Sequence, residues 1–312
     1  PLPAVGIAVD PNVLSFFTKT SSELDADITN PKLWLVHGSA LYANGFYGLA
    51  ADAFARGLEI DSEMNQASYL LATALWRANK QEEAIAALET SLELIPKYDI
   101  GWRLLAKWRV ERGESELAET AARIAFNLNP NRIGTRYVLC QSLMDQSKYE
   151  EALELIEQVT TLDKAPRWIY KLAANCYRQL GAVEKMESAL AMEGPPFDVW
   201  PDPMFQHIPS LIRGKEELTE YSLELFKVNG PTKALQPLMR AFAINTEHTD
   251  LRVALSMELQ FAGKLQPSKQ ILVELQSEPN SNYWKQFASI SIDFNEFEKA
   301  KEYITTAIDL EA

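Results

Sequence analysis

A pattern of small and large apolar residues recurs every 34 residues along this chain. The segments EEAIAALETSLELIP (82–96) and ELAETAARIAFNLNP (116–130) show the repeat. The first carries Ala84, Leu88, Ser91 and Pro96, and the second carries Ala118, Ala122, Ala125 and Pro130, each 34 residues later. The same offsets one unit earlier and one unit later hold Ala50, Phe54, Gly57, Ala152, Ile156 and Val159. A repeat of this length predicts that each unit is one supersecondary element, which buries its apolar face only by stacking on its neighbours.

The first half of each unit follows a second pattern, seen in LWLVHGSALYANGFY (33–47) and GWRLLAKWRVERGES (101–115). Small residues allow two antiparallel helices to approach closely, and large residues fill the space between them. A glycine or asparagine permits the tight turn between the helices, and a proline ends the second helix. Together these residues resemble the tetratricopeptide (TPR) repeat. This resemblance implies an all-α, right-handed superhelical solenoid of about eight helix-turn-helix repeats with a Pro-rich central insert.

The period also predicts how the chain is divided. An N-terminal extension and cap at 1–30 is followed by TPR repeats 1–5 at 31–193, a Pro/aromatic insert at 194–214 and TPR-like repeats 6–8 at 215–312. The units are expected at 31–64, 65–98, 99–132, 133–166, 167–193, 215–248, 249–280 and 281–312. The late units depart from the pattern, because Ser256, Glu258 and Asn295 occupy positions where glycine or tyrosine is usual.

The insert, GPPFDVWPDPMFQHIPSLIRG at 194–214, interrupts the repeats with five prolines and keeps Phe197, Trp200, Met204 and Phe205. Proline does not continue a helix, so the segment must run irregularly. It is too apolar for a free linker, so its aromatic residues need a surface to cover. One interpretation is an ordered loop with a short helix over a hinge or kink between the two sets of repeats. The alternative is a binding loop, or a plug inserted into the groove.

Four segments carry a closer resemblance: LPAVGIAVDPNVLSFF (2–17), ALYANGFYGLAADAFARGLEID (40–61), LAANCYRQLG (172–181) and WPDPMFQHIPSLIRG (200–214). In this order they resemble a group of uncharacterised, often exported bacterial TPR proteins with a "YRxLG…WPDP…LRxG" interruption. The resemblance implies an exported or periplasmic location, with the cytoplasm as the alternative. A chain that begins at Pro1 rather than methionine fits a processed product.

Composition limits the kind of partner. The chain has 312 residues with 43 acidic and 30 basic side chains, and its net charge is −13. A nucleic-acid-binding protein needs a concentrated basic surface, so nucleic acid is not expected as a partner. No apolar run approaches the ~18–20 residues that span a bilayer, so no transmembrane segment is expected.

Catalytic and metal chemistry is not expected either. Cys140 and Cys176 are too few for a disulfide framework or a zinc site, and His37, His207 and His248 lack metal-ligand spacing. His37 occupies a repeat position that faces the partner helix, which predicts a core histidine, and Cys140 is predicted to be an inert buried thiol. No nucleophile lies in a convergent set with a base. The sequence therefore predicts no catalytic residue, no cofactor and no bound metal.

The concave face of a TPR solenoid is lined by fixed positions of each first helix. At these positions the chain carries Tyr69, Trp76, Arg77, Arg103, Lys107, Tyr137, Trp168, Lys171, Asn175 and Arg178. Basic donors beside tryptophan and tyrosine predict a groove for acidic or carboxylate-bearing ligands. The alternative is a solvated face whose charges balance the acidic helices around it. Lys171 and Asn175 resemble two residues of the carboxylate clamp of chaperone-binding TPR domains, but Glu220 stands where another asparagine is required.

These observations favour a non-catalytic protein–protein interaction scaffold that binds a peptide or a partner segment in its concave groove. The alternative is a structural subunit of a larger or homopolymeric assembly, joined through an open solenoid end. The residues predicted for such contacts are Phe197, Trp200, Phe205, Ile304 and Ile308. An enzymatic role is the weakest of the hypotheses.

Overall fold

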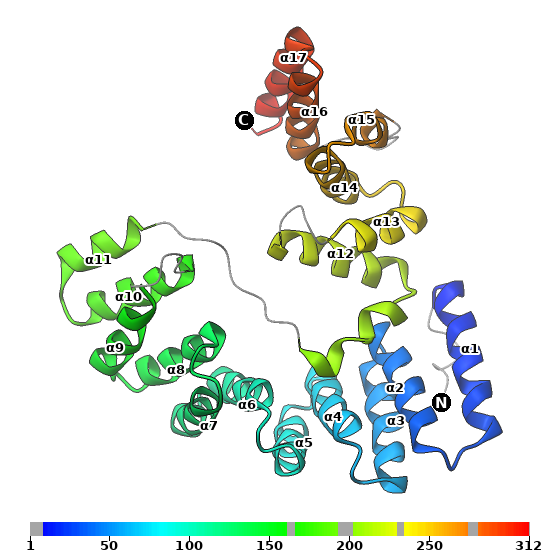
Figure 1. Cartoon of the computed structure of the whole chain (residues 1–312), viewed down its shortest axis with the longest axis vertical. Coiled ribbons are helices and arrows are strands. Elements are labelled where there is room, and N and C mark those ends of the chain that lie inside the picture. Colours follow the sequence, from blue (N-terminus) through cyan, green and yellow to red (C-terminus); the bar gives the residue numbers. More distant parts are fainter. Residues whose placement is uncertain (1–8, 161–165, 193–201, 230–233, 274–279, 312) are drawn as a thin grey trace. The chain divides into compact units, whose positions relative to one another are not determined.

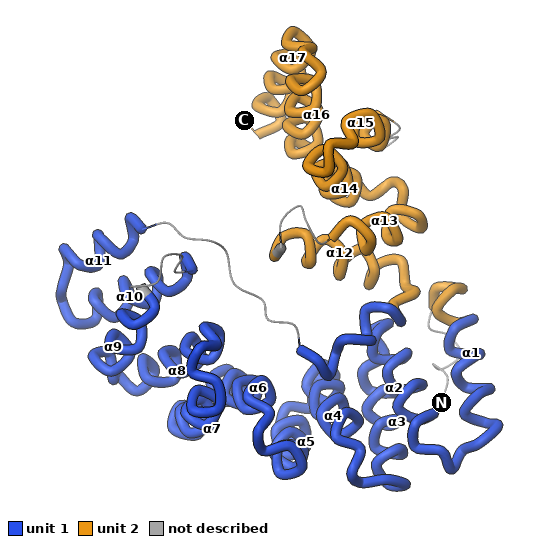
Figure 2. The backbone as a smooth tube through the Cα atoms, viewed as in Figure 1, with its two compact units in different colours: residues 1–7, 15–211 blue, residues 8–14, 212–312 orange. Residues whose placement is uncertain are grey.

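The computed structural model describes residues 9–160, 166–192, 202–229, 234–273 and 280–311, and every structural statement below concerns these residues (Figure 1). Their regular structure consists of α-helices and two short 3₁₀ helices, with no strand among them. The chain divides into two compact units, Pro1–Ile7 with Ser15–Leu211 and Ala8–Leu14 with Ile212–Ala312, which are described separately (Figure 2). None of the described helices combines the length and the apolar character that a membrane crossing requires.

Unit 1 is a row of helix pairs in which each helix packs against the next along the chain. The pairs are α2 (Pro31–Ala43) with α3 (Tyr47–Ile60), α4 (Asn65–Arg77) with α5 (Gln81–Leu94), α6 (Asp99–Glu111) with α7 (Ser115–Leu128), α8 (Ile133–Asp145) with α9 (Tyr149–Thr160), and α10 (Arg167–Gln179) with α11 (Val183–Leu190). Ahead of them, α1 (Pro11–Ala26) places Phe17 edge-on against Phe46, with ring centroids 5.2 Å apart.

One residue in each pair of unit 1 adopts a left-handed backbone conformation and closes the turn between the two helices. Gly45, Asn79, Gly113, Ser147 and Gly181 have φ of 83, 63, 74, 61 and 74°, and they follow one another at intervals of 34 residues. In the third pair the Gly113 N–H donates to the Val110 carbonyl, and the Glu114 N–H donates to the Arg109 carbonyl. Glycine adopts this conformation at no steric cost and asparagine tolerates it, which explains four of the five residues.

Small residues set the distance between the helices of a pair. Ala84, Ala118 and Ala152 are fully buried where each second helix meets the first. In the first pair the close approach uses Gly38, where a Cβ would lie 2.7 Å from the buried Phe54 ring. Large side chains such as Phe54 and Leu88 fill the remaining space. The alternation of small and large residues therefore fixes both the spacing and the angle of each pair.

Unit 2 contains three further pairs: α12 (Lys215–Asn229) with α13 (Leu235–Ile244), α14 (Thr249–Phe261) with α15 (Leu265–Val273), and α16 (Ser281–Asp293) with α17 (Phe297–Asp309). Its core includes an arginine, Arg252, which is 2% exposed. The Arg252 guanidinium donates to the Thr246 and Ile271 carbonyls and lies 5.4 Å from the centre of the Phe242 ring. Burial of a charge is tolerated here because its donors are satisfied by main-chain oxygens.

The all-α TPR solenoid predicted from the period is confirmed by these helix pairs. The first helices of the pairs begin at Pro31, Asn65, Asp99, Ile133, Arg167, Lys215, Thr249 and Ser281. These are the residues at which the sequence places the start of each unit. The insert does not form a body of its own, because residues 202–211 belong to unit 1 and residue 212 begins the last part of unit 2. The hinge expected between the two sets of repeats stays a prediction.

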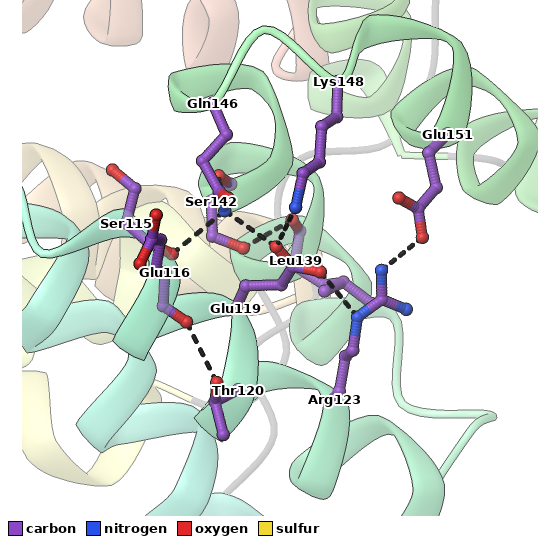
Figure 3. A network of polar contacts seen from close by, with 10 residues as sticks. All are labelled: Ser115, Glu116, Glu119, Thr120, Arg123, Leu139, Ser142, Gln146, Lys148 and Glu151. Carbon is purple, nitrogen blue, oxygen red and sulfur yellow. Dashed lines mark hydrogen bonds and ion pairs between the residues drawn. The ribbon is translucent and has the colours of Figure 1, made fainter.

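A network of charged side chains joins the third and fourth pairs of unit 1 (Figure 3). One carboxylate, that of Glu119, accepts hydrogen bonds from Arg123, Lys148 and Gln146 at 2.7, 2.7 and 2.8 Å. Arg123 reaches on to Glu151 of α9. Burial acts to raise the pKa of Glu119, but the three donors outweigh it and lower that pKa to about 2. The network thus fixes α7 against the turn and helix that follow α8.

We expect Gly38→Val to lower the free energy of unfolding by about 1–3 kcal/mol, because the new side chain overlaps the Phe54 ring. The matched control is Gly48→Val, since a Cβ at Gly48 has no neighbour within 4 Å. That control should change stability by no more than about 0.5 kcal/mol. Chemical denaturation followed by circular dichroism measures both variants. Equal effects at the two positions would contradict the close helix approach.

We expect Glu119→Gln to destabilise the chain at neutral pH by about 1–2 kcal/mol, because charge-assisted hydrogen bonds are lost. A carboxyl whose folded pKa is depressed stabilises the fold above its unfolded pKa, and loses this contribution as the pH falls toward the folded value. The difference between wild type and variant should therefore shrink from about pH 5 down to about pH 2. Glu116→Gln, on the exposed side of the same helix, serves as the control and should change stability by no more than about 0.5 kcal/mol at neutral pH.

Candidate ligand groove

The described part of the insert, residues 202–211, forms two successive 3₁₀ helices, η1 (Pro203–Phe205) and η2 (Ile208–Leu211). Asp202 begins the first one, because its side-chain Oδ1 accepts the Met204 N–H at 3.0 Å. Pro203 follows at the first helical position, where its fixed φ suits the turn and its missing N–H costs nothing. The local sequence Asp-Pro therefore determines how the segment starts.

This segment lies on the first helices of unit 1, with η1 against α4 and η2 against α2 (Figure 1). Two amide side chains of the groove bind its backbone. Gln66 Nε2 donates to the Met204 carbonyl at 2.9 Å, and Asn44 Nδ2 donates to the Leu211 carbonyl at 3.1 Å. Asn44 is 1% exposed. Of the interpretations offered by the sequence, a segment inserted into the groove is the one that this placement of residues 202–211 resembles.

His207 adds a third polar contact from the segment to the groove. Its Nδ1 lies 3.2 Å from Gln66 Nε2, and its Nε2 lies 3.1 Å from Ser39 Oγ. An amide nitrogen only donates, so Nδ1 accepts and the ring proton sits on Nε2, which donates to Ser39. Burial lowers the pKa of His207, which favours this neutral ring at pH 7.

The Asp202 carboxylate is held by two tyrosine hydroxyls. Tyr69 of α4 donates to Oδ2 at 2.9 Å, and Tyr98, which precedes α6, donates to Oδ1. Burial raises the pKa of both tyrosines, and the negative charge of Asp202 raises it further. Both hydroxyls therefore stay protonated at neutral pH and remain donors. A hydrogen bond to a charged acceptor is worth about 1.5–3 kcal/mol, so this pair is a strong anchor.

Phe205 is the apolar anchor of the segment. Its ring centroid lies 5.5 Å from that of Tyr42 and 6.0 Å from that of Tyr69, with tilted and edge-to-face geometry. Asp202 and Phe205 point to the same surface, because both contact Tyr69. The carboxylate and the ring thus enter the groove together.

Beside these anchors the groove keeps a cavity of about 260 Å³. Its lining includes the predicted groove residues Tyr69, Trp76, Arg77, Arg103 and Lys107, together with Asp202 and Phe205 of the segment and Trp108 of α6. The structure therefore brings the first half of the predicted groove together around one space. The sequence did not single out Trp108, although its rings stack on Trp76 with centroids 4.4 Å apart and planes 3° from parallel.

The three cations of this cavity differ in their partners. Arg77 donates to the Tyr47 hydroxyl at 2.9 Å and lies over that ring. Lys107 forms an exposed pair with Glu111 at 3.7 Å, an interaction worth at most about 1 kcal/mol. Arg103 is half-buried, and its Nε has no hydrogen-bond partner among the described residues. Burial lowers the pKa of Arg103, yet a guanidinium stays charged at any pH of interest.

The second half of the predicted groove lies on α8 and α10. Tyr137 and Trp168 pack edge-to-face with ring centroids 4.8 Å apart. Arg178 donates to Asn175 Oδ1 at 2.7 Å, and Lys171 is exposed on the same helix. This hydrogen bond uses the Asn175 Oδ1, so the Nδ2 of Asn175 remains a donor for a ligand acceptor.

The remaining predicted contact residues fall in two places. Phe197 and Trp200 lie outside the described residues. Ile304 and Ile308 lie on α17 and are 40% and 59% exposed. Phe297 of the same helix is 62% exposed, although its place in the repeat pattern predicts a packed residue. It lies seven and eleven residues before the two isoleucines, so the three side chains share one helix face.

Cysteine and histidine positions agree with a structural role. Cys140 and Cys176 are buried free thiols, and burial raises their pKa to about 12 and about 11. Such thiols are unreactive near pH 7. His37 is fully buried, with Nδ1 2.8 Å from Thr20 Oγ1. Within the described ranges no three His, Cys, Asp or Glu side chains gather in a group that could hold a metal ion.

Comparisons with known proteins give one family match and several similar structures. Residues 35–99 match the model of the tetratricopeptide repeat family. YrrB, described as "a TPR protein with an unusual peptide-binding site", has 16% identity and a TM-score of 0.48, covering 74% of this chain and 95% of that chain. A tetratricopeptide repeat protein from Parabacteroides merdae has 12% identity and a TM-score of 0.44, covering 97% and 94%. No curated protein matches the sequence.

The family match covers most of α2 and all of α3, α4 and α5. These helices carry Asn44, Gln66 and Tyr69, which bind residues 202–211. The match therefore covers much of the surface on which the segment lies. It does not extend to the segment itself.

We expect Tyr69→Phe to loosen residues 202–211, because one of the two hydroxyl donors to Asp202 is removed. A loss of about 1.5 kcal/mol corresponds to roughly tenfold faster hydrogen exchange of the segment if exchange follows local opening. Hydrogen exchange with mass spectrometry measures this. Tyr149→Phe is the matched control on α9, where the hydroxyl donates to Ser147 Oγ at 3.5 Å. Unchanged exchange in Tyr69→Phe would argue against the tyrosine anchor.

Proposed function

We propose that the protein is a non-catalytic protein–protein interaction scaffold that binds an extended peptide or partner segment in the groove of α4, α6, α8 and α10. The ligand carries an acidic side chain or a C-terminal carboxylate. The observation that carries this proposal is the cavity between α4, α6 and the insert, where Arg77, Arg103 and Lys107 surround stacked tryptophans. The chain as a whole has a net charge of −13, so this cluster is a locally positive surface on a negatively charged protein.

Arg103 supports a carboxylate as the bound group. A buried donor without a partner costs about 1–3 kcal/mol, and Arg103 Nε is in this position among the described residues. A ligand carboxylate supplies the missing acceptor, and a guanidinium binds carboxylates with two parallel hydrogen bonds. The indole rings of Trp76 and Trp108 offer an apolar wall for the side chain beside that carboxylate.

Lys171 and Arg178 on α10 support a second contact for the same ligand. Neighbouring packed helices lie about 8–10 Å apart, so α6 and α10 are separated by roughly 20 Å. An extended peptide covers this distance with about six residues. A ligand with acidic groups about six residues apart therefore reaches both clusters. Tyr137 of α8 packs against Trp168 of α10, and the two rings contribute aromatic surface.

The test uses N-acetylated acidic hexapeptides with a free C-terminus, screened against the full chain by fluorescence anisotropy. Once a peptide binds, replacing Arg103 and Lys107 by Ala should weaken it by at least tenfold, and the loss should shrink as salt is added. Replacing Arg56 and Lys80 by Ala removes the same charge outside the groove and should leave binding within about twofold. Equal losses in the two double variants would refute the groove.

A second candidate function is assembly through α17. Its exposed face carries Phe297, Ile304 and Ile308, and contiguous apolar surface of this kind marks interaction sites in folded proteins. If copies associate through this face, Ile304→Lys with Ile308→Lys should abolish the oligomer seen by light scattering. Helical content should stay intact, because solenoid repeats depend mainly on their neighbours. An oligomer that survives both lysines would locate the contact elsewhere.

The exported or periplasmic location implied by the resemblance, with the cytoplasm as the alternative, stays a prediction. Fractionation of cells that express the native gene tests it. A binding scaffold is compatible with either compartment, because the buried thiols Cys140 and Cys176 have no disulfide to lose or gain.

A further inference from the structure

Residues 202–211 contact the inner helices of unit 1 through the kinds of interaction that hold a bound peptide. Groove side chains bind the backbone carbonyls of Met204 and Leu211, a pair of hydroxyls binds a carboxylate, and an aromatic slot receives Phe205. Apart from the two short 3₁₀ helices, the segment has no regular structure of its own. Its placement therefore depends on side chains of α2 and α4 and on Tyr98.

We propose that this surface of α2, α4 and α6 is an interaction site for a partner segment with a carboxylate followed three residues later by an aromatic ring. Residues 202–211 are its intramolecular occupant. A protein partner with the pattern Asp-x-x-Phe then binds by taking the place of this segment. The proposal rests on the proposed function only in that both use the concave face of the helix pairs, and it concerns a different ligand position.

The geometry explains the spacing in this pattern. Asp202 caps the 3₁₀ helix that ends at Phe205, and both side chains contact Tyr69 of α4. Tyr69 contacts both of them, with its hydroxyl on the carboxylate and its ring edge-on to Phe205. The spacing Asp-x-x-Phe therefore satisfies Tyr69 in both ways.

The carboxylate is specified by charge as well as by hydrogen bonds. Tyr69 and Tyr98 are held in their neutral, donating forms, and Arg103 lines the adjoining cavity. An amide in place of the carboxylate offers one acceptor oxygen instead of two and carries no charge, so it binds the two donating hydroxyls less strongly. The site therefore discriminates an acidic partner from its amide counterpart.

Covalent attachment makes the segment a strong competitor. A tethered ligand has an effective concentration in the millimolar range. A free peptide with the same contacts must compete with this ligand and therefore binds wild type only weakly. Removing the anchors of the internal segment frees the site without changing the groove. A free peptide should then bind at least tenfold more tightly than it binds wild type.

The probe is a fluorescent peptide with the sequence of residues 202–211, DPMFQHIPSL, titrated against the full chain by anisotropy. The double variant Asp202→Asn with Phe205→Ala should bind it at least tenfold more tightly than wild type does. A peptide with the same two replacements is the control and should bind neither protein. Binding of the probe to neither protein, or equally to both, overturns the proposal.

A groove variant locates the site. Adding Gln66→Ala and Tyr69→Phe to the double variant should abolish binding of the probe, and retained binding overturns the proposal. Hydrogen exchange of α2 to α7 is compared with wild type, and unchanged exchange shows that the substituted protein is folded. In the unaltered chain, probe added above the effective concentration of the tethered segment, on the order of millimolar, should also increase exchange of residues 202–211, and a null result at that concentration overturns the proposal without any variant. Binding of acidic hexapeptides through Arg103 and Lys107 is measured separately, so either proposal can fail alone.

Discussion

The close approach of two antiparallel helices, closed by one residue in a left-handed conformation, is the constraint on which this structure depends. Gly38 and the buried alanines allow the approach, and residues such as Gly45 and Gly113 make the turn that brings the second helix back. Because the turn recurs at 34-residue intervals in unit 1, every first helix presents the same positions to the same side. The groove is a consequence of this regularity, since no single pair could form it.

The first helices share one face, and this face brings together side chains that are far apart in the sequence. Tyr69 and Arg103 lie in successive pairs, yet both face Asp202 or the cavity beside it. Asp202 and Arg103 carry opposite charges and line the same cavity. A negative segment in a basic groove therefore stabilises the groove that it occupies. The same complementarity predicts the chemistry of an external ligand.

Much of the fold could be predicted from local signals. The helices begin where the period places them, and His37 and Cys140 are buried as their repeat positions predict. Each of these inferences rests on residues within one unit, where helix periodicity and turn chemistry act. The position in the repeat also singled out five residues that line the cavity, Tyr69, Trp76, Arg77, Arg103 and Lys107. It did not single out Trp108, because its stacking partner Trp76 lies in the preceding pair. Periodicity reports which face a residue occupies and does not report which neighbour from another repeat it meets.

The sequence by itself determined the all-α repeat architecture, the left-handed turns and the face that carries the basic and aromatic side chains. Local backbone sterics and the burial of periodic apolar residues are enough to specify these features. Only the tertiary structure decided where residues 202–211 lie. Asp202 is separated from Tyr69 by 133 residues and from Tyr98 by 104, and a contact across such distances leaves no periodic signal. It forms because a short turn with an acid and an aromatic ring fits a groove that exists only after the helix pairs have stacked.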